Sequence, residues 1–107
     1  MTATIHIDAN RAQLVHGHSV SSVDWREVTR VLAFKRDLLT TDLICLRIEA
    51  GPERSLEVNE EVPGWDALLR ALQEFLPGVM DPKKIYALLS TPAFAANETV
   101  IFDRHAA

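Results

Sequence analysis

The chain has 107 residues, of which 48% are hydrophobic and 24% are charged, and its formal net charge is −4. This hydrophobic content excludes an intrinsically disordered chain. The scarcity of glycine and proline excludes a collagen-like chain, and the single cysteine excludes a disulfide scaffold. The excess of acidic residues counts against nucleic acid as a partner, because phosphate contacts require a basic face. We therefore expect one globular domain over residues 1–107.

The chain shows no targeting or membrane-spanning pattern. Met1–Asp8 has neither the basic region nor the apolar stretch of a secretory signal. The apolar runs are all far shorter than the roughly 18 residues of a membrane span, and Leu43–Leu46, for example, ends at Arg47. Together with the lone thiol, these features predict a cytoplasmic protein with no membrane partner.

Strand patterns dominate as far as about Glu61, where the hydrophobic residues recur with a period near two. Thr4–Asp8 alternates, Arg11–Val15 is ambiguous, and a turn is expected at His16–Ser19. Three further strands are predicted, at Val28–Arg36, Asp42–Ala50 and Ser55–Asn59. Their short connections favour an antiparallel meander.

Two of these strands carry apolar residues on particular faces. In Val28–Arg36 one face is expected to hold Val28, Leu32 and Phe34. Arg30 interrupts that face, which indicates a bulge or a partly wet surface. In Asp42–Ala50 one face holds Ile44, Leu46, Ile48 and Ala50. Leu43 and Cys45 point the other way, which suggests that the first half of this strand is covered on both sides.

After Pro63 the hydrophobic period becomes helical. One apolar stripe contains Trp65, Leu68, Leu69, Leu72, Phe75 and Leu76. Pro63 suits a first helical turn and Pro77-Gly78 ends the helix, which is predicted at about 63–76. Asp81-Pro82 begins a shorter helix at about 82–90.

A final strand is expected at Thr99–Arg104, with Val100 and Phe102 facing one way and Ile101 and Asp103 the other. Strands followed by helices and then a strand predict the α+β class. The expected fold is a mainly antiparallel sheet of four to five strands, packed on one longer and one shorter helix.

The chemistry-bearing residues form no strong catalytic pattern. His16-x-His18 could place two imidazoles on one strand face, but a metal site needs three or four ligands, and a solvated turn is the simpler interpretation. Cys45 lacks a neighbouring histidine, and the glutamates between Glu53 and Glu61 fit a structural role beside a helix start. Phosphate-loop motifs do not occur. We expect no catalytic residue, no metal site and no cofactor.

Two surfaces are candidates for binding. Arg26, Arg30 and Arg36 share strand parity and could bind an anion or an acidic partner, although a solvated or internally paired face is the simpler interpretation. The apolar segment around Phe94, within residues 91–97, either covers the core or takes part in an interface.

Three stretches of the chain resemble a family of small proteobacterial proteins with no assigned activity. They are Phe34–Leu46, then Pro63-Gly64-Trp65 with the following leucines, and finally Pro92-Ala93-Phe94 with Asn97-x-Thr99-Val100. The resemblance covers residues 25–104, implies a bacterial cytoplasmic source and implies no catalytic residues. It draws attention to a candidate surface of Lys35, Arg36, Asp37, Asp42 and Trp65.

The sequence favours a non-enzymatic interaction module that binds a protein partner or a second copy of itself, because its apolar residues exceed what a thin core needs. The predicted binding residues are Arg30, Lys35, Arg36, Asp37, Trp65 and Phe94. The alternative is a small-ligand-binding or catalytic domain, with a pocket between sheet and helices lined by Arg30, Arg36, Asp37 and Trp65. The sequence leaves open whether the Arg26–Arg36 face or the Ala93–Ala96 segment is the functional one.

Overall fold

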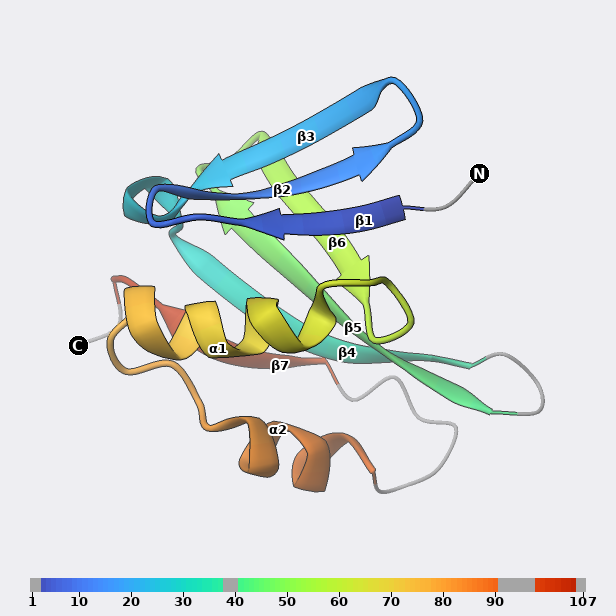
Figure 1. Cartoon of the computed structure of the whole chain (residues 1–107). Coiled ribbons are helices and arrows are strands. Elements are labelled where there is room, and N and C mark those ends of the chain that lie inside the picture. Colours follow the sequence, from blue (N-terminus) through green and yellow to red (C-terminus); the bar gives the residue numbers. More distant parts are fainter. Residues whose placement is uncertain (1–2, 38–40, 91–97, 106–107) are drawn as a thin grey trace.

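The computed structural model describes residues 3–37, 41–90 and 98–105. These residues form two antiparallel β-sheets and two α-helices (Figure 1). The three-stranded sheet has the order β1 (Ala3–Ile7), β2 (Arg11–His16), β3 (Ser19–Asp24), and the four-stranded sheet has the order β6 (Arg54–Asn59), β5 (Asp42–Ala50), β4 (Arg30–Asp37), β7 (Thr99–Asp103). The remaining elements are the 3₁₀ turn η1 (Trp25–Glu27) and the helices α1 (Trp65–Phe75) and α2 (Pro82–Leu89).

The α+β class, the antiparallel pairing and the meander of β4, β5 and β6 agree with the prediction. The number of sheets does not, because the described residues form seven strands in two sheets rather than one sheet of four to five. The missed strand is β3, with the sequence Ser19–Asp24. Only Val23 of this strand is buried, so the alternation that identifies a strand is almost absent from it.

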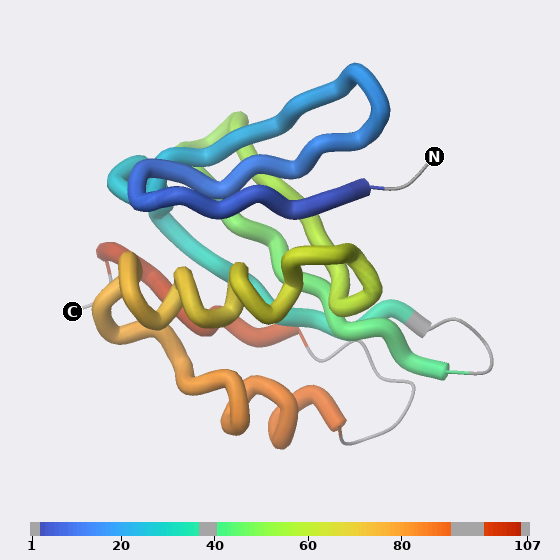
Figure 2. The backbone as a smooth tube through the Cα atoms, viewed as in Figure 1, coloured from blue at the N-terminus to red at the C-terminus, as the bar shows by residue number. Residues whose placement is uncertain are grey.

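The core lies between the two sheets and α1. In Figure 1 the three-stranded sheet and α1 both lie in front of the four-stranded sheet, and Figure 2 traces the chain from α1 to α2 below it. One cluster of buried side chains joins all three, and α1 contributes Trp65, Leu68, Leu69, Ala71 and Leu72. Burying a large apolar side chain is worth about 1.5–3 kcal/mol, so this stripe is a main source of stability. No helix in the described part of the chain is long and apolar enough to cross a membrane.

The start of α1 differs from the prediction. Pro63 does not occupy the first helical turn; its carbonyl oxygen instead accepts a hydrogen bond from the Ile5 amide at 2.8 Å. Gly64 is the N-cap, with φ of 99°, a left-handed conformation that favours glycine. A Cβ at Gly64 would lie 2.5 Å from the Ile5 oxygen. The glycine therefore allows β1 and the start of α1 to approach closely.

The strand β7 also departs from simple alternation. Its register against β4 shifts between Val31 and Leu32, as at a β-bulge. As a result the consecutive residues Ile101 and Phe102 are both buried in the core, whereas Val100 is 44% exposed. The prediction that Val100 and Phe102 share a face is therefore wrong.

Candidate functional site

The four-stranded sheet has two unlike faces. On β4 the residues Val31 and Ala33 belong to the core cluster, and they face α1 and the three-stranded sheet. Leu32 and its alternating neighbours, among them Arg30, lie on the opposite side, here called the outer face. The expected grouping of Val28 with Leu32 was wrong, because Val28 precedes the strand and lies in the core.

The outer face carries an apolar cluster of its own, formed by Leu32, Phe34, Leu43 and Cys45. The register pairs Phe34 with Cys45, and Leu32 and Leu43 lie on the same side of the two strands. Leu32, Leu43 and Cys45 are only 3%, 9% and 2% exposed, yet none of them belongs to the core cluster. This outer-face cluster matches the prediction that the first half of β5 is covered on both sides.

Other parts of the chain shield this cluster, since Leu32, Leu43 and Cys45 are all buried. Val100 extends the cluster toward β7, because the register places it opposite Leu32. The outer face therefore combines buried apolar residues with an exposed valine at its border.

Phe34 lies between two guanidinium groups. The Cζ atoms of Arg36 and Arg47 are 5.9 and 5.7 Å from the centre of its ring, within cation–π range. Arg36 is held there by Glu57, whose Oε2 accepts a hydrogen bond from Nη2 at 2.8 Å. Phe34 is itself only partly buried, so the centre of this arrangement is an accessible aromatic ring.

Acidic residues complete the border of the cluster. Glu49 accepts a hydrogen bond from Arg30 Nε at 2.8 Å and one from Arg47 Nε at 3.3 Å. The hydrogen bond from Arg30 is the main reason that the pKa of Glu49 lies below its usual value. The same interaction raises the pKa of Arg30. Glu98 lies 3.7 Å from Arg47 Nη2, so the residue just before β7 reaches this border too.

Two predicted site residues lie elsewhere on β4. Lys35 points to the inner side, is only 5% exposed and forms an ion pair with Asp42 at 3.3 Å. Asp37 is the last residue of β4, opposite Asp42 in the register. Only Arg30 and Arg36 of the predicted basic residues therefore lie on the outer face. Arg26, predicted to share their face, is in η1 and exposed.

Trp65 lies on the other side of the sheet from these arginines. It is buried in the core cluster, and its Nε1 donates a hydrogen bond to the Tyr86 hydroxyl at 2.8 Å. It cannot share a pocket with Arg30 and Arg36, which face outward. Phe94, the remaining predicted binding residue, lies outside the described residues, as does the Ala93–Ala96 segment.

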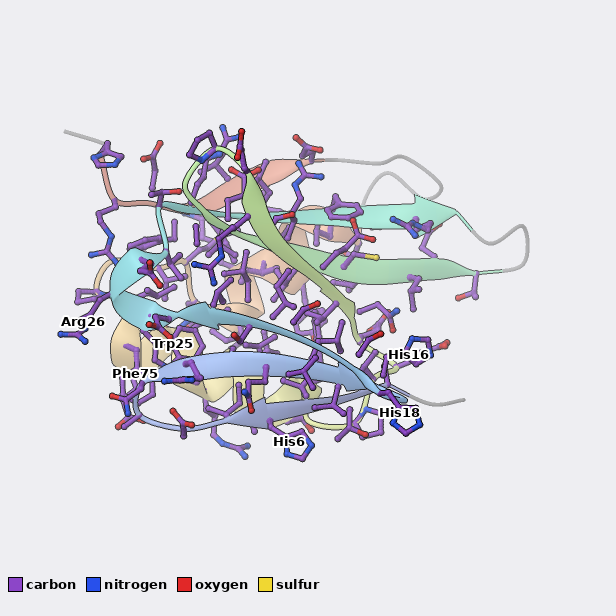
Figure 3. The ribbon with its side chains drawn as sticks, turned by 90° about the horizontal axis from the view of Figure 1, so that it is seen from above. His6, His16, His18, Trp25, Arg26 and Phe75 are labelled. Carbon is purple, nitrogen blue, oxygen red and sulfur yellow. The ribbon has the colours of Figure 1, made fainter. Side chains whose placement is uncertain are left out.

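The histidines and the cysteine form no metal site in the part of the chain that the structure describes. His16 and His18 lie at the tip of the β2–β3 hairpin, and His6 lies along β1 away from them (Figure 3). Cys45 is a free thiol, and burial raises its pKa. Trp25, the residue before Arg26, is buried and stacks on Phe75 with ring centres 5.4 Å apart.

A groove of about 710 Å³ borders the outer face along β7. Pro77, Gly78 and residues 100–104 line it. The neighbouring edge of β7 is partly occupied, because the Met80 amide donates a hydrogen bond to the Ile101 oxygen at 2.9 Å. Val100 belongs both to this groove and to the border of the outer-face cluster.

The sequence analysis gave Glu57 only a structural role, and it did not single out Glu49 or Glu98. Glu49, Glu57 and Glu98 sit opposite or beside the arginines only once the strands pair, because cross-strand neighbours are remote in sequence. No protein-family model matches the chain, and neither a curated protein nor a solved structure is significantly similar to it. Function must therefore be inferred from the residues of the site itself.

Proposed function

We propose that this chain is a non-enzymatic interaction module that binds a protein partner through the outer-face cluster. One observation carries the proposal: Phe34, which is only partly buried, lies on the outer face within cation–π range of Arg36 and Arg47. Aromatic residues and arginine are enriched in protein interfaces, so an accessible ring beside two arginines is typical of a contact surface. A reducing, cytoplasmic compartment fits the lone Cys45 thiol.

The composition of the outer face supports a protein as the partner. Interface hot spots are enriched in aromatic residues and arginine and are surrounded by contacts that exclude water. Phe34 with Arg36 and Arg47 has this composition, and the ion pairs to Glu49 and Glu57 surround it. These exposed ion pairs contribute little to stability by themselves, at most about 1 kcal/mol each. The main effect of these ion pairs is to hold the arginine side chains in fixed orientations.

The alternative, a ligand pocket between the sheet and the helices, has less support. Its expected lining residues include Trp65, which is buried in the core, and Arg30 and Arg36, which face outward. Lys35, the buried cation on the inner side, is paired with Asp42. These positions favour a binding surface over an internal pocket.

Site-specific photo-crosslinking tests the proposal. A photoreactive phenylalanine analogue is placed at Arg36 on the outer face and, as a control, at Arg70, an exposed position on α1. In cells that produce the chain, we expect a discrete adduct, heavier than 12.0 kDa, from position 36 and not from position 70. Equal adducts at both positions, or none at position 36, would contradict the proposed function.

A further inference from the structure

We infer that β3 binds an extended peptide segment of a partner protein, which adds to the free edge of the three-stranded sheet as a fourth strand and carries a basic side chain. This edge belongs to a different sheet from the outer-face cluster, so the inference goes beyond the proposed function. The direction of the backbone groups of β3, the weak protection of its edge and a groove beside it each support the inference.

The register shows which backbone groups of β3 face its free edge. The Trp25 amide donates to the Asn10 oxygen at 3.0 Å and continues the ladder between β2 and β3. Hydrogen-bonded positions alternate along an antiparallel ladder, so every second residue back from Trp25 also bonds to β2. Val20 and Ser22 lie between those positions and direct their amides and carbonyls to the free edge. The Ser22 carbonyl accordingly accepts a hydrogen bond from Arg54 Nη2 of β6 at 3.0 Å.

The edge of β3 lacks the usual protection against strand addition. Exposed sheet edges are normally blocked by charged side chains, proline or bulges, and Ser19–Val23 contains none of these. The other described edges that lie near helices are closed by main-chain hydrogen bonds, from the Ile5 amide to Pro63 at β1 and from the Met80 amide to Ile101 at β7. Figure 1 shows β3 as the strand of its sheet that lies farthest from α1.

Among the described residues, the side chain of Arg54 is what reaches the edge of β3. It is 54% exposed, and its Nη1 also lies 3.6 Å from Glu27. Exposed interactions of this kind are weak, so a main-chain amide of a peptide can replace Arg54 at the Ser22 carbonyl while Arg54 keeps its pair with Glu27. Arg54 therefore competes with the peptide for this carbonyl.

A groove of about 400 Å³ lies beside the edge, between β3 and the start of β6. The strand β6 alternates as β3 does. The Glu60 amide bonds to the Ile44 oxygen of β5, so Ser55 directs its backbone to the free edge of β6. Backbone groups thus border the groove on both sides, and an extended peptide is a partner that carries donors and acceptors along both of its edges. The groove is lined by Val20, Ser21, Ser22, Glu53, Arg54 and Ser55.

The charge of the groove favours a basic side chain in the peptide. Of the two charged residues that line it, Arg54 is paired with Glu27. Glu53 forms no ion pair within the part of the chain that the structure describes, so it is the unbalanced charge. A lysine or arginine of the peptide complements it. Val20, which is 58% exposed, offers apolar contact to a β-branched side chain on the added strand.

Titration of the full chain with synthetic peptides, followed by amide shifts in NMR spectra, tests the inference. The probe is the capped pentapeptide Thr-Val-Lys-Val-Thr, and its fully N-methylated form is the control because it has no backbone donors. We expect saturable shifts centred on Val20 and Ser22, with a dissociation constant of about 1 mM for so short a segment. The N-methylated peptide should bind at least about tenfold more weakly. A glutamate in place of the peptide lysine should weaken binding by about threefold or more.

Two variants make the test specific to this edge. Val20→Pro removes an amide that faces the free edge and spares the bonds to β2, so the chain should fold and bind at least about threefold more weakly. Arg54→Ala removes the competitor at the Ser22 carbonyl and should bind about two- to fivefold more tightly. Arg70→Ala, at an exposed position on α1, is the matched control and should leave binding unchanged. Circular dichroism establishes that each variant is folded.

Several outcomes would overturn the inference. They are the absence of shifts in β3 at about 5 mM peptide, well above the expected dissociation constant, and equal binding of the N-methylated peptide. Weaker binding to Arg54→Ala would contradict the competition at Ser22 and with it the addition of a strand there. If Val20→Pro does not fold, the two peptides decide the question on the natural chain alone. The crosslink at Arg36 is independent of these results, so the outer face and the β3 edge are tested separately.

Discussion

Trp65 and Tyr86 connect the two helices through one hydrogen bond, from the indole Nε1 to the Tyr86 hydroxyl at 2.8 Å. Trp65 is the first residue of α1, and Tyr86 lies in the middle of α2. Because Trp65 is buried, its indole N–H has little access to water as an alternative partner. The bond therefore fixes the position of α2 against the start of α1.

Removing the hydroxyl tests this connection. Tyr86→Phe should lower the free energy of unfolding by about 1–2 kcal/mol, because a buried donor loses its partner. Urea unfolding measures the change. Trp65→Phe and the double variant complete a mutant cycle, in which we expect a coupling of about 0.5–2 kcal/mol. Strict additivity of the two changes would show that the bond contributes nothing.

Gly64 should be far less tolerant of a side chain than Gly51. Both have positive φ, but a Cβ at Gly64 would meet the Ile5 oxygen at 2.5 Å, whereas a Cβ at Gly51 would meet nothing within 4 Å. Gly51→Ala should cost about 1 kcal/mol, the penalty of the left-handed conformation. Gly64→Ala adds a backbone clash and should cost more than about 3 kcal/mol. Equal melting temperatures of the two variants would contradict this account.

The ion pairs of Glu49 predict a pH dependence of stability. The pKa of Glu49 is lowered in the folded chain, mainly by the hydrogen bond from Arg30. Its contribution is therefore fully present above the unfolded pKa of about 4.3 and is lost as the pH falls through the folded value. The difference in unfolding free energy between the natural chain and Glu49→Gln should shrink below about pH 4. A difference that stays constant from pH 7 to pH 3 would rule out this role.

The thiol of Cys45 should be nearly inert in the folded chain. Burial raises its pKa, so the reactive thiolate is scarce, and the side chain is also shielded. At pH 8 we expect a disulfide reagent to react at least 100-fold more slowly with native than with guanidinium-unfolded protein. Comparable rates would show that the outer-face cluster opens readily.

Because the pKa of Cys45 is raised on folding, its effect on stability has the opposite sign to that of Glu49. The contribution is present below the unfolded pKa of about 8.5 and declines as the pH rises towards the folded value. The natural chain should therefore lose stability relative to Cys45→Ala above about pH 8.5, as measured by thermal unfolding.

Local pattern was enough to predict several elements of this fold. The stripe from Trp65 to Leu76 repeats at the helical period, and Asp81 caps α2 by accepting a hydrogen bond from the Lys83 amide, as expected of an Asp-Pro start. The meander of β4, β5 and β6 follows from alternation and short turns. In each case the signal lies within a few neighbouring residues.

The candidate site was predictable only in part. Leu43 and Cys45 stand out in the sequence because they are apolar on the less apolar side of β5. Their association with Phe34 depends on the pairing of β4 with β5, and the role of Glu98 depends on β7 joining the same sheet. Lys35 could not be distinguished from its exposed neighbours, because its burial arises from the inner side of the sheet.

The sequence by itself determined the α+β class, the helices and the meander, because hydrophobic period and turn residues act over short range. Only the tertiary structure decided the second sheet, the bulge of β7 and the grouping of Phe34 with Arg36 and Arg47. These features depend on the register between strands, and a shift of one residue would exchange the two faces of a strand. The register also explains part of the apolar excess in the composition. It places Leu32, Leu43 and Cys45 on the outer face, away from the main core.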